Sequence, residues 1–261
     1  MRLNVLTLAG FCFVLASGAQ SEEKRNPMLP SGWRVHDLER PVPVVVIPGA
    51  TAAAAPSDAI ILFDGTNLDE WVGCVSTNKK KQYNPEGKAL WKVKDGCMEI
   101  NSTGGLISRK AFGDMQLHVE WASPNPAEKK GQKRGNSGIY IMGRYEVQIL
   151  DCYENTSYAD GMTAGIYGQT PALANACRKP GEWQTYDIFF TAPRFDGDTL
   201  VSPAYVTVIH NGVLVQNHTE YLGPTSHKKV GLYTPHPEKL PIFLQDHNNP
   251  VRFRNIWVRE L

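Results

Sequence analysis

Glu146 and Gln148 are two polar residues that stand two positions apart in an otherwise apolar run between Gly135 and Asp151. Side chains alternate along a β-strand, so a strand here would project both polar groups from the same face of a sheet. A carboxylate and an amide that project together from a sheet are typical of a site that binds a polyhydroxylated ligand or performs catalysis. The alternative is an antiparallel sheet with one solvent-exposed face.

The residues around this pair predict a β-hairpin. Tyr145, Val147 and Ile149 would form the opposite, core-facing side of the strand. The preceding Gly143-Arg144 has the Gly-X composition of a two-residue type II′ turn. Such a turn sets Ile141 opposite Glu146 across the hairpin.

Residues 1–19 have the pattern of a secretory signal peptide. Arg2 precedes a mostly apolar stretch, and Ser17-Gly18-Ala19 supplies the small residues of a cleavage site. The apolar stretch is short for a membrane span, and no later segment approaches the required length. We therefore expect a secreted or periplasmic protein with no transmembrane segment.

The charge of the chain is nearly balanced. The sequence has 27 basic and 26 acidic residues, and Arg2 is the one charged residue among the first 19. The lysine clusters at residues 79–81 and 129–130 lie in polar, loop-like contexts, where a solvated turn is the usual role. Because no basic stripe interleaved with aromatic residues is present, nucleic acid is not the expected partner.

Four cysteines follow the predicted signal peptide: Cys74, Cys97, Cys152 and Cys177. An even number of cysteines in an exported protein indicates disulfides, and four cysteines allow three pairings. Proximity in the sequence favours Cys74 with Cys97 and Cys152 with Cys177. Each bridge would close a loop of about 25 residues, worth about 3 kcal/mol in loop-closure entropy. The alternative is that the core needs no bridges and some thiols stay free.

The rest of the chain divides into an extended arm and one β-rich domain. Residues 20–57 are rich in Pro and Ala, and prolines interrupt a Val-rich run. Because proline is tolerated only at sheet edges, we expect an arm that lies along the domain. Residues 58–261 form short strand-like runs between Gly, Pro, Asn and Asp, which predict an all-β sandwich or barrel. Within them, Asn211-Gly212 predicts a type I′ hairpin turn.

The last strand, residues 251–261, carries apolar residues on both faces near its centre, so we expect it to be covered on both sides. Strict alternation puts Phe253 and Trp257 on one face. It puts Arg252 and Arg254 together on the other, as structural ion-pair partners or as ligand contacts.

Several motifs occur in order along residues 58–261. They are Leu62-Phe-Asp-Gly-Thr-Asn-Leu-Asp-Glu-Trp71, Leu117-His-Val-Glu-Trp121, Gly135-Asn-Ser-Gly138, Tyr145-Glu-Val-Gln-Ile-Leu-Asp151, Ala164-Gly-Ile-Tyr167, Gly181-Glu-Trp-Gln184, Asn211-Gly212, and Leu244-Gln-Asp-His247 through Phe253-Arg-Asn-Ile256. Together they resemble the 3-keto-disaccharide hydrolase family, also known as domain of unknown function 1080. The arm resembles that of secreted bacterial members.

The resemblance implies a concanavalin-like (LamG-like) jelly roll of two antiparallel sheets, with a carbohydrate ligand on the concave sheet. It also implies an enzyme whose substrate is a glycoside oxidised to a ketone at carbon 3. The ketone acidifies the carbon 2 proton, so a base can remove it, the aglycone leaves carbon 1 and water then adds. Such a site needs a base, a donor or cation for the enediolate, and an acid for the leaving oxygen.

Residues of these motifs can supply each role. Glu146 is the candidate base, and Gln148 and Asn136 could hold sugar hydroxyls. Tyr167 and Trp183 could stack on the apolar face of the sugar.

Further polar residues belong to the predicted site. His247, close to Gln245, could be the acid or a metal ligand, or it could cap a turn. Glu120 lies centrally in an apolar strand, where burial without a partner would be costly. It could serve the site or pair with Arg252 or Arg254, which are themselves candidate ligand contacts.

A divalent cation is one candidate cofactor. Glu146, Asp151, Asp246 and His247 offer oxygen and imidazole ligands suited to such an ion, which would stabilise the enediolate. The spacing contains no recognised metal motif, and protein donors such as Arg252 would suffice instead.

Two other functions stay open. Retaining β-glycanases of the same shape carry Glu-x-Asp-x-Glu, with or without a bulge residue, on a concave strand. Glu146, Gln148 and Asp151 imitate the bulged form, although alternation puts Asp151 on the wrong face unless a β-bulge intervenes. The other function is a secreted carbohydrate-binding module without catalysis, because the jelly roll is also a lectin fold.

Overall fold

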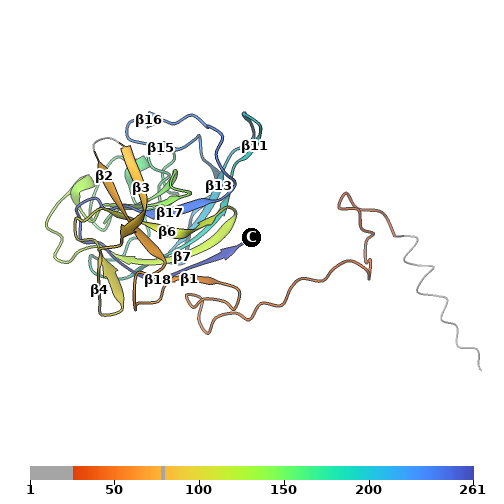
Figure 1. Ribbon diagram of the computed structural model, residues 1–261, viewed down its shortest axis with the longest axis horizontal. Helices are drawn as coiled ribbons and strands as arrows, with labels where there is room; N and C mark the ends of the chain where they lie inside the picture. Colours follow the sequence, from red (N-terminus) through yellow and green to blue (C-terminus); the bar gives the residue numbers. More distant parts are fainter. Residues whose placement is uncertain (1–25, 78–79) are drawn as a thin grey trace, which may run out of the picture. The chain divides into compact units, whose positions relative to one another are not determined.

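A computed structural model of the chain describes residues 26–77 and 80–261, without the side chains of residues 75–86 (Figure 1). The predicted signal peptide lies outside the described residues. Val46–Leu261 form one compact unit, and the chain before them belongs to a separate unit. In the described part of that first unit, Met28 bridges Arg34, whose guanidinium donates to the carbonyl of Asn26 at 2.8 Å. Residues 46–57 of the predicted arm therefore belong to the β-rich unit.

The β-rich unit contains two large antiparallel sheets. We call the first the β7 sheet; its strand order is β14-β13-β10-β7-β18-β5-β4, with β1 also paired to β18. Its strands are β1 (Ile60–Phe63), β4 (Lys92–Lys94), β5 (Cys97–Glu99), β7 (Met115–Ala122), β10 (Gln184–Thr191), β13 (Tyr205–His210), β14 (Val213–Glu220) and β18 (Arg252–Glu260).

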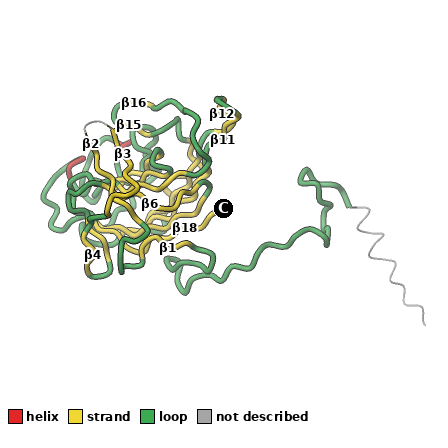
Figure 2. The backbone as a smooth tube through the Cα atoms, viewed as in Figure 1, coloured by secondary structure: helices red, strands yellow, loops and turns green. Residues whose placement is uncertain are grey.

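The second sheet, which we call the β9 sheet, has the strand order β3-β2-β6-β17-β8-β9. Its strands are β2 (Trp71–Thr77), β3 (Lys80–Lys88), β6 (Gly105–Phe112), β8 (Ser137–Ile141), β9 (Tyr145–Ile149) and β17 (Leu240–Leu244). Two small ribbons pair β11 (Arg194–Asp196) with β12 (Thr199–Ser202) and β15 (Thr225–Ser226) with β16 (Lys229–Val230). Among the described residues the helices are the short 3₁₀ turns η1 (Gly131–Lys133) and η2 (Ala159–Gly161) (Figure 2).

The core lies between the two sheets. Val119 of β7 and Val147 of β9 belong to one buried cluster, together with the large aromatic side chains of both sheets. Because side chains alternate along each strand, the neighbouring Glu120 and Glu146 point away from this core on opposite outer faces. Figure 1 shows β6 and β17 in one layer and β7 and β18 in the other. The predicted all-β sandwich is confirmed, and its two antiparallel sheets are consistent with a jelly roll.

The β8–β9 hairpin forms, but the predicted register is wrong by one residue. Ile141 pairs with Tyr145, and Tyr140 pairs with Glu146. Directly opposed residues share a face of the sheet, so the core-facing Ile141 cannot pair with the outward-facing Glu146. Three residues, 142–144, make the connection, and the first two have positive φ angles of 54° and 64°.

A β-bulge in β18 also changes a prediction. The pairing of β18 with β7 shifts between Arg254 and Trp257, and Asn255 has a φ of 46°. The extra residue reverses the alternation. Phe253 is therefore in the core, whereas Trp257 lies on the outer face and stacks on His118, with ring centroids 5.2 Å apart. Trp257 is nonetheless buried, so the expected cover on both sides of this strand is confirmed there.

The hairpin predicted at Asn211-Gly212 is confirmed. His210 pairs directly with Val213, and the two turn residues have positive φ angles of 52° and 81°. Both angles suit a type I′ turn, which follows the twist of the flanking strands.

The predicted bridge between Cys74 and Cys97 is wrong. Cys74 lies in β2 of the β9 sheet, whereas the thiol of Cys97, in β5 of the β7 sheet, donates to the carbonyl of Lys94 at 3.1 Å. Closeness in sequence does not bring residues together when their strands enter different sheets. Cys152 and Cys177 do lie together, as thiols joined by a hydrogen bond. Their bridge stays a prediction.

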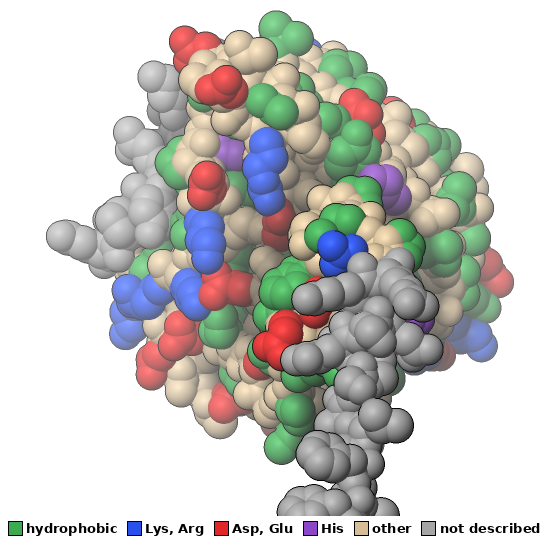
Figure 3. All heavy atoms as spheres, turned by 90° about the vertical axis from the view of Figure 1, so that its right-hand side faces the viewer, with side chains coloured by type: hydrophobic (Ala, Val, Ile, Leu, Met, Phe, Trp, Pro, Cys, Tyr) green, Lys and Arg blue, Asp and Glu red, His purple; other side chains and the backbone are tan. Residues whose placement is uncertain are grey.

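Two sequence expectations concern membranes and nucleic acid. None of the helices in the described part of the chain has the length and hydrophobicity that a bilayer crossing requires. On the face shown in Figure 3, Lys and Arg side chains are interspersed with Asp and Glu. That face thus presents no stripe of a single charge.

Candidate functional site

Glu146 projects from β9 onto the outer face of the β9 sheet, where it is 3% exposed. Its cross-strand partner Tyr140 donates a hydrogen bond from its phenol to the carboxylate. Burial and the charge of Glu146 raise the pKa of Tyr140 well above its usual value, so the phenol keeps its proton and stays a donor. A Cβ atom at Gly138 would lie 2.1 Å from Oε1 of Glu146, so the absence of a side chain at this position makes room for the carboxylate.

Gln148 shares this face with Glu146, as the sequence predicts. In the amide orientation that satisfies its neighbours, its nitrogen donates to Oε1 of Glu146 and to the carbonyl of Ser137, each at 3.1 Å. Asn136 is buried close by, and its amide donates to the main-chain and side-chain oxygens of Gln132 at 2.8 and 3.1 Å. Gln148 therefore orients the carboxylate, whereas the amide nitrogen of Asn136 is held within the protein.

The second edge of β9 carries two loops that bring further side chains to the site. Gln148 exchanges main-chain hydrogen bonds with Ala164 and Gly165, at 2.9 and 3.0 Å. The main-chain nitrogen of Glu146 donates to the hydroxyl of Thr225 at 3.2 Å. The loop that ends in Tyr167 and the ribbon that contains Thr225 are thus fixed along the strand that carries Glu146.

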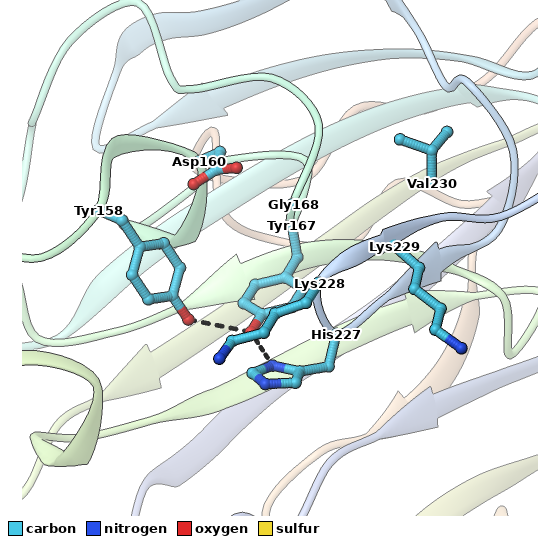
Figure 4. Close-up of a pocket in the computed structure, with 8 residues that line it drawn as sticks. All are labelled: Tyr158, Asp160, Tyr167, Gly168, His227, Lys228, Lys229 and Val230. Carbon is cyan, nitrogen blue, oxygen red and sulfur yellow. Dashed lines mark hydrogen bonds between the residues drawn. The ribbon is translucent and has the colours of Figure 1, made fainter.

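A hollow of about 430 Å³ opens between these loops (Figure 4). It is lined by Tyr158, Asp160, Tyr167, Gly168, His227, Lys228, Lys229 and Val230. The phenol of Tyr167 is 2.9 Å from the phenol of Tyr158 and 3.1 Å from Nδ1 of His227. Tyr167 also lies close enough to Glu146 for that carboxylate to raise its pKa, after the larger effect of burial. Tyr167 therefore lies at the wall of the hollow and also near the carboxylate of the candidate base.

Gln245 also reaches this site, and His247 follows two residues later in the chain. The amide of Gln245 donates to the phenol of Tyr140 at 3.3 Å. His247 lies in the exposed turn after β17, where its carbonyl accepts from Asn249 at 2.8 Å. This position fits the turn alternative, and a role for the His247 ring in catalysis stays a prediction.

Asp151 is engaged in a structural ion pair. Nε of Arg134 lies 3.0 Å from its Oδ2, and the main-chain nitrogen of Tyr153 donates to its Oδ1 at 3.1 Å. Burial raises the pKa of this carboxyl group, against the opposing effect of Arg134. The carboxylate therefore fixes the loop after β9, and its predicted catalytic role has no support from these contacts.

The predicted metal ligands are not gathered. Across residues 26–77 and 80–261, apart from the undescribed side chains, no group of three or more His, Cys, Asp or Glu residues is arranged to hold a metal ion. Asp246 accepts hydrogen bonds from the main chain of Gly104 and Asn248, at 3.1 and 2.8 Å. The described donor set therefore does not fit the expected cation site.

Glu120 lies on the outer face of the β7 sheet and pairs with Arg254. Nε of Arg254 is 2.6 Å from its Oε2, and the amide of Asn255 donates to its Oε1 at 2.9 Å. Asn255 and Trp257 also donate to the carbonyl of Ala53, at 2.8 and 3.1 Å. Of the two roles considered for Glu120, the structure shows the ion pair with Arg254. The segment before β1 partly covers this pair.

Trp183 and the two arginines form a second cluster on this outer face. The guanidinium carbons of Arg254 and Arg252 lie 4.1 and 5.3 Å from the ring centroid of Trp183. Arg252 also lines a polar hollow of about 820 Å³ with Glu99 and Lys179. The predicted site residues thus fall on two opposite faces: Glu146, Gln148, Gln245 and Tyr167 on one, and Glu120, Trp183, Arg252 and Arg254 on the other.

Sequence reasoning missed Tyr140, Tyr158 and His227. The register error placed Ile141 opposite Glu146, and the correct pairing would have identified Tyr140. Tyr158 and His227 come from loops whose meeting depends on the whole fold. A signal for them was the pattern of aromatic and imidazole side chains in Gly-rich and Ser-rich turns, which is weak by itself.

Two packed antiparallel sheets define a β-sandwich, an architecture that also occurs in lectin domains. The chain belongs to the family described as 3-keto-alpha-glucoside-1,2-lyase-like domain, whose model matches residues 58–259. This match confirms the family resemblance found in the sequence motifs.

Solved structures agree with this assignment. A protein of Parabacteroides distasonis ATCC 8503, provisionally described as a glycosyl hydrolase, is 43% identical, with a TM-score of 0.75 over 90% of this chain and 100% of its own. Two others from that organism, with the same description, are 18% and 22% identical, with TM-scores of 0.54 and 0.50. Both comparisons cover 78% of this chain, and 94% and 99% of the respective relatives. These two show the fold alone. A search of curated proteins found no match. The family and the first relative support a carbohydrate-active function.

Proposed function

We propose that this protein cleaves 3-keto-glycosides and that Glu146 is the base that removes the proton from carbon 2. The observation that carries the proposal is the environment of Glu146. Its carboxylate lies over Gly138, accepts hydrogen bonds from Tyr140 and Gln148, and is close to a hollow of about 430 Å³. Family membership supports the substrate class. These hydrogen bonds orient the carboxylate for proton transfer.

The chemistry follows from the ketone at carbon 3. Glu146 takes the carbon 2 proton, and the electron pair of that bond forms an enolate with the ketone. The enolate then re-forms the ketone as the bond from carbon 1 to the aglycone oxygen breaks, leaving a double bond between carbons 1 and 2. The aglycone oxygen takes a proton, and water adds across the double bond to give the free 3-keto sugar.

Two neighbours of Glu146 have positioning roles in this scheme. The phenol of Tyr140 and the amide of Gln148 donate to the carboxylate and set its direction. Gln245 in turn donates to Tyr140 and fixes that phenol. Because the carboxylate is buried, a substrate reaches it only when a neighbouring side chain moves aside.

The retaining-glycanase alternative receives less support. It needs a second carboxyl group about 5 Å from Glu146 that is available to protonate a leaving group. Asp151 is the residue that the sequence offers, and its carboxylate is bound by Arg134 and by the main chain of Tyr153.

The test is turnover of a 3-keto-glucoside by the purified protein and by the Glu146→Gln variant. The amide keeps the shape of the carboxylate but cannot accept the proton, so we expect turnover to fall by about 10²-fold or more. The Asp151→Asn variant is the matched control for charge removal, checked for folding by thermal unfolding. Turnover of Glu146→Gln within a few-fold of the parent would remove Glu146 from the mechanism, and no turnover by the parent would refute the proposed function.

A further inference from the structure

We propose that Tyr167, supplied with a proton by His227, is the acid that protonates the leaving aglycone. This inference rests on the proposed function and adds the second half of its proton transfers. It moves the acid from His247, in the exposed turn after β17, to the hollow beside Glu146.

The first support is the hydrogen bonding of the Tyr167 phenol. Its oxygen is 2.9 Å from the phenol of Tyr158 and 3.1 Å from Nδ1 of His227. Figure 4 shows the three side chains pointing toward one another at the wall of the hollow. A phenol has one proton, so Tyr167 can pass it to a ligand while accepting another from the imidazole.

The second support is the way the fold places this phenol relative to Glu146. Ile166, the residue before Tyr167, forms a β-bridge with Val147, the residue after Glu146. On the same edge of β9, the hydroxyl of Thr225 accepts from the nitrogen of Glu146, and Thr225 lies two residues before His227. The base, the phenol and the imidazole are therefore held by one strand edge.

The third support is electrostatic. Burial, hydrogen bonding with Tyr158 and the negative charge of Glu146 raise the pKa of Tyr167. A phenol in this state resists ionisation, so transfer of its proton requires another to arrive as it leaves. His227 is exposed and can exchange protons with solvent. When Glu146 takes the carbon 2 proton its charge is lost, and one cause of the raised pKa is removed.

The step balances as follows. The bond from carbon 1 to the aglycone oxygen breaks, and its electron pair stays on that oxygen. The oxygen takes the proton of the Tyr167 phenol, and the phenol oxygen takes the proton from Nδ1 of the His227 imidazolium. The products are the neutral aglycone alcohol, the phenol and a neutral imidazole, which regains its proton from solvent.

This arrangement also assigns the hollow to the aglycone. The leaving oxygen must lie within hydrogen-bond reach of Tyr167, so the group attached to it extends into the space that Tyr158 and His227 line. The hollow, at about 430 Å³, has room for a sugar-sized aglycone.

The test compares two substrates that differ in their need for an acid: the methyl and the 4-nitrophenyl 3-keto-glucosides. Methoxide is a poor leaving group, whereas nitrophenolate leaves without a proton. We expect Tyr167→Phe to slow methyl glycoside cleavage by about 10²-fold and nitrophenyl glycoside cleavage by only a few-fold. His227→Gln should show the same preference for the nitrophenyl glycoside over the methyl glycoside.

The matched control is Tyr158→Phe, which removes one hydrogen bond to Tyr167 and keeps the ring beside Gly161. Because the phenol of Tyr167 stays in place, this variant should not show the selective loss of methyl glycoside cleavage expected of Tyr167→Phe. An equal loss for both substrates in Tyr167→Phe, with unfolding temperature unchanged, would show a structural role and overturn the inference. Failure of the parent protein on both substrates would instead overturn the proposed function, and the inference with it.

Discussion

Gly138 and Glu146 illustrate how a single small residue can determine the geometry of the proposed catalytic base. The outward face of β8 leaves space only because residue 138 has no side chain, and the carboxylate of Glu146 occupies that space. The last position of the motif Gly135-Asn-Ser-Gly138 therefore requires glycine because a side chain would displace the carboxylate of Glu146. The first position favours glycine for another reason, since the φ of Gly135 is 59°, in the left-handed region.

We predict that Gly138→Ala reduces turnover of a 3-keto-glucoside by about 10²-fold, as does loss of the base. The new Cβ would meet Oε1 of Glu146 at 2.1 Å and force the carboxylate out of its contacts with Gln148 and Tyr140. The measurement is kcat and KM, with thermal unfolding as the check on folding. A well-folded variant with parental kcat would show that this position of the carboxylate is not the active one.

At this scale the sequence predicts which residues share a face better than it predicts which residues meet. Alternation alone placed Glu146 and Gln148 together, because that relation is set within one strand. The partner Tyr140 was missed, since register depends on the length of the turn at residues 142–144. A shift of one residue changes every cross-strand neighbour.

At the scale of elements, Cys152 and Cys177 connect the end of β9 to the loop before β10. The thiol of Cys177 forms a hydrogen bond with Cys152, and this bond, against burial, lowers the pKa of Cys152 to about 7. Thiolate is the species that attacks to form a disulfide. We propose that residues 1–19 direct export and that the pair becomes oxidised outside the cytoplasm.

Mass spectrometry of exported, unreduced protein should therefore find Cys152 linked to Cys177, and a bridge over this loop should add about 3 kcal/mol to the free energy of unfolding. Cys97 is the internal control: burial raises the pKa of its thiol, and we expect it to stay unbridged. Free thiols at both Cys152 and Cys177 in such material would contradict the pairing.

Local turn chemistry predicted the hairpin at Asn211-Gly212, although it failed at Gly143-Arg144. Asn211-Gly212 gave the correct hairpin because positive φ angles at two successive residues favour these residue types. The bulge at Asn255 was not predictable from alternation, and it moved Trp257 to the face opposite Phe253. The side chain of Asn255 in this bulge donates a hydrogen bond to the carbonyl of Ala53, about 200 positions away in the chain.

At the scale of the whole molecule, the two outer faces divide the predicted site. Glu120 and Glu146 occupy equivalent outward positions, but β7 and β9 enter different sheets. Sequence periodicity predicts which residues of a strand share a face, but it does not predict which sheet the strand joins. A single site that combined Glu146 with Arg252, Arg254 and Trp183 could therefore not be checked before the topology was known. The class of fold was predictable because strand density and turn residues are distributed over the entire domain.

The separation of the faces also limits the mechanism. Stabilisation of the enolate by Arg252 or Arg254 would require groups that lie across the core from Glu146. The described side chains of Tyr140 and Gln148, which donate to Glu146, both belong to the β9 sheet. The elimination that we propose therefore begins at this carboxylate.

Cleavage of a 3-keto-glucoside in D₂O, with mass and NMR analysis of the released 3-keto sugar, is the direct measurement of this elimination. Removal of the carbon 2 proton by Glu146, followed by hydration of the double bond, should place deuterium at carbon 2 in the product formed by the parent protein. A reaction without enzyme corrects for spontaneous exchange, and Glu146→Gln should cleave and exchange about 10²-fold more slowly than the parent or slower. Complete cleavage with only protium at carbon 2 would rule out this elimination, because the glycosidic bond would then have broken without the proton transfer that Glu146 is proposed to perform.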